Sequence, residues 1–451
     1  MQKDIPNEVI EIYKKLQKAN FEVYFVGGCV RSLLLSNSVK DWDLTTNATP
    51  EQILKVFQNG FYDNQFGTVG VSFELKGEKK IAEITTFRKE WSESPTHKPE
   101  KIEWGKTIED DLSRRDFTIN AIALEIKNGE YKIIDPLDGE KDLKEKIVRA
   151  VGNPNLRFKE DALRLMRGIR IATELQFTIE EKTWKSIKSD AKLLEHISKE
   201  RVQAELLRIL KSEFAYEGAI MLYESGLLKY IIPQLLEGIG LSQARAGRHH
   251  TEDVFTHNVL SLKFCPSTNP IVKFAALIHD IGKPQVASKD DKGLVIFYNH
   301  EVAGAKIAGE LCDRLKFSKK DRDKVITLVR WHMFSVNENL TDSAVRRFIR
   351  RIGVENVADM MDLRIGDRLG GGTQKAESWR LKKFKERVAG ELAPKPFSMN
   401  DLAVNGKDVM RILNIKPGPK VGEILKKLFE EVDENLKLNN KEYLEKRIKE
   451  L

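Results

Sequence analysis

The sequence predicts an α+β protein, in which a small mixed α/β head precedes a long and mostly α-helical neck, body and tail. Strand-like patterns are confined to the chain before residue 140, and the pattern beyond it is almost wholly helical. The chain has 451 residues, of which 41% are hydrophobic and 32% charged. This length and composition fit about three domains of ~150 residues. They exclude a disordered tail protein and a small disulfide-stapled domain.

Helix and strand patterns alternate through the head. Apolar residues at helical spacing predict a helix over residues 6–19, and the apolar run VYFV predicts a buried strand that ends at Gly27-Gly28. CVRSLLL is expected to start a second helix, and residues 65–75 and 80–88 are predicted strands. Residues 89–106 are polar and hold two prolines, which predicts a long surface loop of the kind that often carries function.

The helical part has two clear breaks, GGG at residues 370–372 and PKP at residues 394–396. With the change of pattern near residue 140, they suggest four segments. We expect a head over 1–140, a helical neck over 141–215, a helical body over 216–372 and a helical tail over 373–451.

Charge and cysteine content narrow the class of protein. The net charge is +8, and residues 371–451 carry more than half of it, with 18 basic against 13 acidic residues. A local excess of this kind suits a polyanionic partner. Cys29, Cys265 and Cys312 lie far apart and no CxxC occurs, which indicates a reduced, cytoplasmic protein without disulfides. No secretory signal is visible and no apolar run approaches ~18 residues, so we expect no membrane partner.

A Gly-Gly turn followed by an Asp-x-Asp motif forms the first candidate site. Glycine lets a phosphate approach the backbone, and a helix starting at Gly28 and carrying Arg31 points N–H groups toward it. Asp41 and Asp43 are two apart on a predicted strand, so both carboxylates can hold one divalent ion. Glu83, on a later strand, can be a third carboxylate. Two-metal phosphoryl transfer needs such a set, whereas an isolated Asp-x-Asp is more often a solvated turn.

The segment RRDFTINA, residues 114–121, is the second candidate. Arg115 can reach phosphates. Asp116 and Asn120 lie one helical turn apart and can hold a ribose. The alternative for this segment alone is a capped helix start.

GGCVR, DWDLTT and RRDFTINA, in this order, resemble the bacterial tRNA nucleotidyltransferase and poly(A) polymerase family, class II. The resemblance is strong over about the first 215 residues and moderate beyond. It implies a head similar to the DNA polymerase beta nucleotidyltransferase fold. Members of the resembled family add nucleotides to RNA 3′ ends without a nucleic-acid template. Asp41 and Asp43 would be the catalytic Mg²⁺ ligands, while Gly28, Arg31 and Arg115 would hold triphosphate and ribose. Ser32 departs from the family, which usually has Asp after this arginine.

Glu160-Asp161-Ala-Leu-Arg164 forms the third candidate, with Asp161 and Arg164 expected on one helix face. Cytosine and adenine both present an amino donor beside a ring-nitrogen acceptor, which suits an Asp acceptor beside an Arg donor. Uracil and guanine present the reverse order and would leave both side chains unpaired. The family's protein template has this pattern; the alternative is an ordinary salt bridge. Arg167 and Arg170 follow on the same helix and are expected to hold phosphates or the template residues.

Six of the eight histidines lie between residues 249 and 332, and they form the fourth candidate. Histidines and carboxylates on separate helices can form a metal cluster of nitrogen and oxygen ligands. Their order resembles the HD phosphohydrolase superfamily, which implies an HD-like body and a second site that binds Mn²⁺ or Ni²⁺. The expected ligands are His257, His279, Asp280, His300, His332 and Asp367. The alternative is a silent scaffold; His249 and His250 are expected to be solvated.

These motifs together predict, through the resemblance, an enzyme that adds CCA from CTP and ATP to the 3′ end of tRNA. An accessory phosphohydrolase activity would belong to the HD-like part. The tail turn Pro417-Gly418-Pro419 would contact tRNA, or form a plain helix corner. An A-adding enzyme and a poly(A) polymerase remain alternatives; CC-adding relatives lack the loop that residues 89–106 supply. A different alternative is an HD phosphohydrolase whose head only binds RNA, against which the intact Asp-x-Asp argues.

Overall fold

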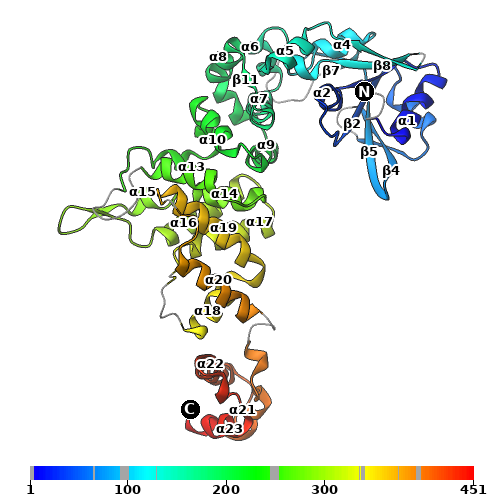
Figure 1. Ribbon diagram of the computed structural model, residues 1–451. Helices are drawn as coiled ribbons and strands as arrows, with labels where there is room; N and C mark the ends of the chain where they lie inside the picture. Colours follow the sequence, from blue (N-terminus) through cyan, green and yellow to red (C-terminus); the bar gives the residue numbers. More distant parts are fainter. Residues whose placement is uncertain are drawn as a thin grey trace. The chain divides into compact units, whose positions relative to one another are not determined.

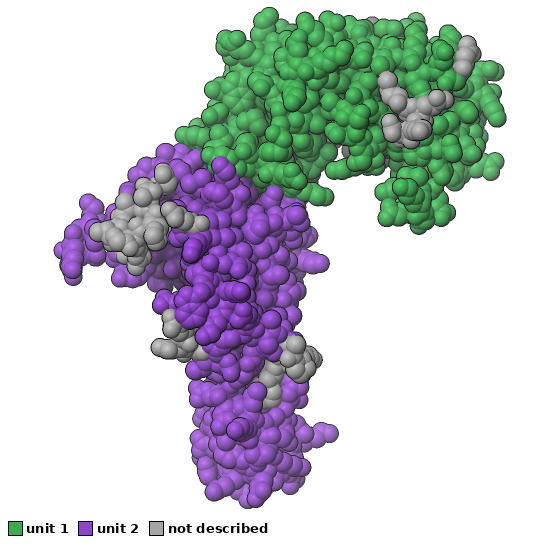
Figure 2. All heavy atoms as spheres, in the orientation of Figure 1, with its two compact units in different colours: residues 1–236, 314–317 green, residues 237–313, 318–451 purple. Residues whose placement is uncertain are grey.

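The computed structural model describes residues 5–63, 67–91, 101–127, 129–243, 253–334, 336, 341–373, 375–392 and 398–451. The chain forms two compact units (Figure 2). Unit 1 comprises residues 1–236 with 314–317, and unit 2 comprises residues 237–313 with 318–451. The head and the predicted neck therefore fall together in unit 1.

A seven-stranded mixed sheet forms the centre of the head, with strand order β3-β4-β5-β2-β1-β8-β9 (Figure 1). The central strand β1 is buried on both faces, as the continuous apolar run VYFV predicts. It pairs antiparallel with β2 and β8, whereas β2 pairs parallel with β5. The strands are β1 (Val23–Val26), β2 (Trp42–Thr46), β3 (Gly60–Asp63), β4 (Thr68–Leu75), β5 (Glu78–Thr86), β8 (Ala123–Lys127) and β9 (Glu130–Ile134).

Short helices surround this sheet. The first packs an apolar stripe against it, with the Tyr13 ring stacked on Phe25 of β1 at a centroid distance of 5.2 Å. A Thr49 capping box and Pro50 start the third. The head helices are α1 (Asn7–Lys18), α2 (Gly28–Leu34), α3 (Pro50–Val56), α4 (Ile108–Ser113) and α5 (Gly139–Glu145).

The segment over residues 89–106, predicted to be a surface loop, differs from that prediction at both ends. Strands β6 (Arg88–Trp91) and β7 (Lys101–Trp104) pair antiparallel, with Arg88 opposite Trp104. A loop can therefore occupy only the part between these strands, and residues 92–100 lie outside the described residues. The two strands provide each other's backbone hydrogen-bond partners, which their polar sequence gave no reason to expect.

The rest of unit 1 is helical apart from one short parallel pair, β10 (Ile147–Val148) with β11 (Thr178–Ile179). An apolar stripe on the longest helices packs them together. The helices are α6 (Pro154–Glu160), α7 (Leu163–Leu175), α8 (Glu181–Asp190), α9 (Lys199–Lys211), α10 (Ala215–Glu224), α11 (Leu228–Ile231) and α12 (Pro233–Leu236).

In its described residues, unit 2 is helical with one small antiparallel strand pair, β12 (Ser288–Lys289) and β13 (Val295–Ile296). The helices α13, α14, α17 and α19 pack on one another around buried residues such as Val272, Leu328 and Leu363. The body helices are α13 (Val254–Phe264), α14 (Pro270–Ile278), α15 (Lys283–Val286), α16 (His300–Arg314), α17 (Lys319–Trp331), α18 (Asp342–Ile352), α19 (Val357–Gly370) and α20 (Trp379–Leu392).

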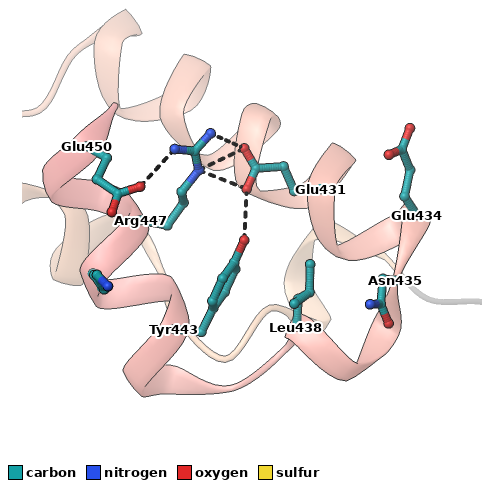
Figure 3. A pocket seen from close by; sticks show the side chains of 8 residues that line it. Glu431, Glu434, Asn435, Leu438, Tyr443, Arg447 and Glu450 are labelled. Atoms are coloured by element: carbon teal, nitrogen blue, oxygen red, sulfur yellow. Dashed lines mark hydrogen bonds and ion pairs between the residues drawn. The ribbon is translucent and has the colours of Figure 1, made fainter.

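The end of unit 2 has a small core of its own, which includes Val409, Leu428 and Ile448. Its helices are α21 (Gly406–Leu413), α22 (Pro419–Glu434) and α23 (Lys441–Glu450). A shallow polar pocket lies between α22 and α23, where Glu431 binds Arg447 (Figure 3). Within it, Arg447 pairs with Glu431 and Glu450, and the Tyr443 hydroxyl donates to Glu431.

Two breaks were predicted in the helical part, the glycines at residues 370–372 and PKP at residues 394–396. Helix α19 ends at Gly370, as the three glycines indicate, and Pro419 starts α22 after the Pro-Gly-Pro turn. The break at residues 394–396 lies outside the described residues. Among the described residues, no helix has the length and apolar character needed to cross a bilayer.

Candidate active sites

Carboxylates gather at one edge of the head sheet, on the parallel strands β2 and β5. Asp43 of β2 stands directly opposite Glu83 of β5, and Asp41 precedes β2 by one residue. Burial, and next the charge of Glu83, raise the pKa of Asp43 to about 6, although Arg115 opposes the shift. Three carboxylates this close repel one another, which a divalent cation with oxygen ligands would relieve.

The Gly-Gly turn lies against this carboxylate cluster. Gly27 has a φ of +73°. A Cβ at Gly27 would lie 3.1 Å from Nη1 of Arg115 and 3.4 Å from Oδ2 of Asp43. The turn therefore brings a bare backbone to a position between a cation and a carboxylate. The next residue, Gly28, begins α2, which carries Arg31.

Arg31 is the strongest indication of an anion site in the head. Its Nη1 donates to Oδ1 of Asn120, and its buried Nε has no hydrogen-bond partner among the described residues. Burial, and next the neighbouring Arg170, lower the pKa of Arg31. A buried guanidinium with a spare donor and another cation nearby fits a phosphate group.

Asp116 and Asn120, expected to hold a ribose, are engaged within the protein. Asp116 accepts from the Asn120 amide at 3.0 Å and from Nε of Arg167 at 2.7 Å. Burial opposes its ionisation, but Arg167 and Asn120 outweigh burial and hold the pKa of Asp116 well below its usual range. Asp116 therefore fixes the guanidinium of Arg167 and the amide of Asn120, and Asn120 in turn positions Arg31.

Asp111 was not singled out from the sequence, yet it positions Arg115. It is fully buried and accepts from Arg115 at 2.9 Å and from Arg114 at 2.7 Å. Asp111 lies on α4, four residues before Arg115, and this spacing is the signal that identifies such a pair.

Asp161 and Arg164 do not share a helix, so that prediction is wrong. Helix α6 ends at Glu160, Asp161 has extended backbone at φ −151°, and α7 begins at Leu163. Arg164 is held by Oε2 of Glu160 at 2.7 Å and by two backbone carbonyls. Both side chains are largely buried at the break between the two helices. They remain separate, oriented groups, one an acceptor and one a donor.

Helix α9 supplies partners to this region. Arg201 binds both carboxylate oxygens of Asp161, at 3.3 and 3.0 Å. Glu205 binds Nε of Arg170 at 2.6 Å, and Arg170 also pairs with Glu174. Of the two arginines expected to hold phosphates or template residues, Arg167 binds Asp116 and Arg170 binds these two glutamates.

In unit 2, the six predicted metal ligands lie together on five segments. They come from α13 (His257), the end of α14 (His279 and Asp280), the start of α16 (His300), the end of α17 (His332) and α19 (Asp367). The two oxygens of Asp280 face different partners. Oδ2 lies 3.3 Å from Nε2 of both His257 and His279, and Oδ1 lies 3.2 Å from His300 and 3.5 Å from His332.

The histidine rings are oriented for ligation. The Nδ1 atoms of His279, His300 and His332 each lie 2.7–2.9 Å from the carbonyl of the residue three positions earlier. This contact leaves Nε2 of each ring turned toward Asp280, as in metal-binding histidines. Two groups result, His257 with His279 and Asp280, and Asp280 with His300 and His332. Asp367 lies 3.3 Å from Nε2 of His257, beside the first group.

Cationic side chains of the protein balance the negative charges of Asp280 and Asp367. Lys283, not predicted from the sequence, binds Oδ2 of Asp280 at 2.5 Å. Burial opposes ionisation of Asp280, but Lys283 and next His279 hold its pKa well below the usual range. Burial alone would lower the pKa of His279, but the carboxylates, Asp280 foremost, raise it to about 10. His249 and His250 lie outside the described residues.

Comparison with known proteins gives matches along most of the chain. Residues 23–149 match the family described as the Poly A polymerase head domain, and residues 286–448 match tRNA nucleotidyltransferase domain 2. Residues 176–238 match an RNA-binding segment of polymerase A. The chain is 38% identical to the A-adding tRNA nucleotidyltransferase of Deinococcus radiodurans over 336 residues, 72% of this chain and 75% of that protein.

Two further relatives match over nearly their whole length. A CCA-adding enzyme of Ligilactobacillus salivarius is 30% identical over 99% of this chain and 98% of its own. A crystal structure of the Bacillus stearothermophilus CCA-adding enzyme in complex with CTP superposes with a TM-score of 0.74. It shares 27% identity over 98% of this chain and 96% of that one.

Proposed function

The chain belongs to the bacterial tRNA nucleotidyltransferase family, and we propose that it adds CCA, from CTP and ATP, to the 3′ end of tRNA. The observation that carries the proposal is the carboxylate cluster of Asp41, Asp43 and Glu83 beside the Gly27 turn and the buried cation Arg31. Full-length similarity to a CCA-adding enzyme supports the choice of product.

Members of this fold class use divalent metal ions, and we propose that Asp41 and Asp43 hold Mg²⁺ here. The ion would neutralise charge on the reacting phosphate and activate the attacking hydroxyl. Arg31 and Arg115 bind triphosphate oxygens, and the Gly27-Gly28 turn lets the triphosphate lie against the backbone. The 3′-hydroxyl of the RNA attacks the α-phosphorus, the bond to the β-phosphate bridge oxygen breaks, and pyrophosphate leaves.

Base selection is assigned to Asp161 and Arg164. The ionised Asp161 accepts from the exocyclic amino group of cytosine or adenine, and Arg164 donates to the adjacent ring nitrogen. Uracil and guanine would place an acceptor before Asp161 and a donor before Arg164, so two buried groups would lose their partners. The separate anchoring of the two side chains, by Arg201 and by Glu160, supports this assignment.

The test uses tRNA transcripts that end at the discriminator base, at C and at CC, with labelled CTP and ATP. A CCA-adding enzyme extends all three to CCA. Extension of the CC transcript alone would instead identify an A-adding enzyme, the activity named for the Deinococcus relative. Long adenosine tracts on unrelated RNA would identify a poly(A) polymerase. Failure to extend any RNA would overturn the proposal.

We propose a second activity for unit 2, a metal-dependent phosphohydrolase. Asp280 faces two groups of histidines through its two oxygens, so it can bridge two ions. Nitrogen and carboxylate ligands suit Mn²⁺ or Ni²⁺, and such ions lower the pKa of bound water. The substrate would be a phosphate ester at a damaged RNA end, such as a 2′,3′-cyclic phosphate. Hydroxide formed from water would add to phosphorus, and one ester P–O bond would break. The released sugar oxygen would take the proton that the water gave up.

This second proposal is tested with RNA ending in a 2′,3′-cyclic phosphate and with bis(p-nitrophenyl) phosphate, each with Mn²⁺, Ni²⁺ or Mg²⁺. Metal content of the purified protein is measured in parallel. Hydrolysis together with bound metal is expected. Absence of both would identify the cluster as a packed scaffold without chemistry.

A further inference from the structure

Asp161 lies in an unusual place for a residue that must hold one charge state and one orientation. It ends α6 with extended backbone, outside the hydrogen-bond ladder of either helix. Its side chain is 7% exposed, so water contributes little to solvating the carboxylate. Something other than helix geometry must therefore fix it.

Arg201 supplies that constraint from α9, 40 residues away in the sequence. Its two terminal nitrogens donate to the two carboxylate oxygens of Asp161, at 3.3 Å and 3.0 Å. A bidentate pair of this kind fixes the plane of the carboxylate as well as its charge. The backbone N–H of Leu163 donates to Oδ1 at 3.1 Å and fixes the same plane from the other side.

The position of Arg201 on α9 also indicates that its role is to bind Asp161. It lies in the first turn of α9, which begins at Lys199. A cation there opposes the helix dipole, so the helix itself gains nothing from an arginine at this position. The contact with Asp161 accounts for its placement.

We propose that Arg201 is a specificity-determining positioning residue, which keeps Asp161 an oriented acceptor so that only bases with an amino donor are accepted. The inference rests on the proposed role of Asp161 in base selection. Arg201 acts through Asp161 and need not contact the nucleotide. Its effect is therefore expected in the choice between nucleotides more than in the rate with the correct ones.

The physical reason is the orientation of the acceptor. A carboxylate whose plane is fixed presents its lone pairs to the amino group of cytosine or adenine, whereas uracil and guanine offer no donor at that position. Without the fork of Arg201 the carboxylate of Asp161 can rotate, so a base without the amino donor is no longer held against a fixed acceptor.

The experiment compares Arg201→Gln and Arg201→Lys with the parent. Arg208→Gln is the matched control, because Arg208 lies on the same helix, is 55% exposed and has only a 3.7 Å contact with Glu174. For each protein, kcat/KM is measured with CTP, ATP, UTP and GTP on the transcripts described above. Thermal unfolding checks that each variant is folded.

For Arg201→Gln, discrimination of CTP against UTP should fall about ten- to hundredfold, the usual effect of one charge-assisted hydrogen bond. Arg201→Lys keeps the charge without the fork and should fall between Gln and parent. Arg208→Gln should match the parent throughout.

Unchanged discrimination in a folded Arg201→Gln protein would overturn the inference, as would an equal loss of rate with all four nucleotides. If the parent itself adds no nucleotide, the proposed function fails instead. The activity of the parent enzyme therefore distinguishes a failure of the Arg201 inference from a failure of the proposed function.

Discussion

In the head, Asp43 lies among other carboxylates, whereas Asp280 in the histidine cluster lies among cations. The consequence appears in their pKa values, which move in opposite directions. Burial and Glu83 raise that of Asp43 to about 6. Lys283 and His279 overcome burial and hold that of Asp280 well below the usual range. Both residues are proposed metal ligands, yet the protein compensates the charge of Asp280 more fully than that of Asp43, for which Arg115 only opposes the shift.

This difference implies two kinds of metal site. A divalent ion bound in the head would relieve a repulsion between carboxylates, so its binding would be favoured by charge. An ion at Asp280 must replace Lys283 as the partner of Oδ2 and displace the proton of His279. Its binding should therefore strengthen as the pH rises. Each variant below is expected to affect these two regions differently.

The largest expected effect is on nucleotide addition. Asp43→Asn keeps the size of the side chain but removes a carboxylate from the proposed ion site. The rate of CTP and ATP addition should fall about 10³-fold or more, since a metal-bound electrostatic contribution is lost from every cycle. Single-turnover extension of the tRNA transcripts measures it.

Hydrolysis of the cyclic phosphate by Asp43→Asn should stay at the parental level, because Asp43 and Asp280 belong to different units. Near-parental nucleotide addition would mean that the head carboxylates are not the reaction centre.

Asp280→Asn should give the reverse pattern. Loss of the bridging carboxylate removes a ligand from both histidine groups, so bound metal and hydrolysis should fall about a hundredfold, while CCA addition persists. Metal analysis of the purified variant is the direct measurement. His332→Ala is the matched partner, because His332 belongs only to the second group and should leave the first ion bound. Equal loss of metal in both variants would argue for a single ion.

Sequence patterns predicted the local parts of these sites better than the long-range ones. The Gly-Gly turn, the strand carrying Asp43 and the histidine ligands follow from short-range signals, and the structure brings the predicted residues of each group together. The break at Asp161 could not be predicted, because the apolar periodicity of EDALRLMRGIR continues through it.

Partners contributed by distant segments were missed for a related reason. Arg201 reaches Asp161 across 40 residues, and no periodicity in the sequence reports such a contact. Lys283 is different, since it is three residues after Asp280 and an ion pair at this spacing is common. The β6–β7 hairpin was missed because the pairing of two polar segments depends on their surroundings.

The third prediction tests the opposite pKa shifts through stability. In protein treated with EDTA at pH 8, Asp43→Asn should raise the free energy of unfolding by up to about 3 kcal/mol, because it removes an ionised group that the fold disfavours. Asp280→Asn should lower it by about 3 kcal/mol, because Lys283 and His279 lose a buried partner. Urea unfolding followed by circular dichroism measures both.

The pH dependence of the Asp43 effect has a defined sign. Its folded pKa lies above the unfolded value of about 4, so the penalty is absent below pH 4 and develops as the pH rises through about 6. Asp43→Asn and the parent should therefore converge in stability at pH 4. A stabilisation that does not change between pH 4 and pH 8 would contradict the electrostatic explanation.

The smallest expected effect concerns Lys283. Its ammonium group pairs with Oδ2 of Asp280, where a metal ion would bind. Lys283→Met keeps the length of the side chain and its packing over the Phe297 ring but removes the charge 2.5 Å from Oδ2. Because the ion no longer competes with an ammonium group, Mn²⁺ should bind about tenfold more tightly, one charge interaction at a partly screened site. Isothermal titration calorimetry at pH 8 measures this affinity, and Lys289→Met, on the exposed strand β12, is the control for an overall change in charge. Weaker binding by Lys283→Met would show that Lys283 supports the ligand geometry, and the contrast between a more fully and a less fully compensated aspartate would then not govern metal affinity.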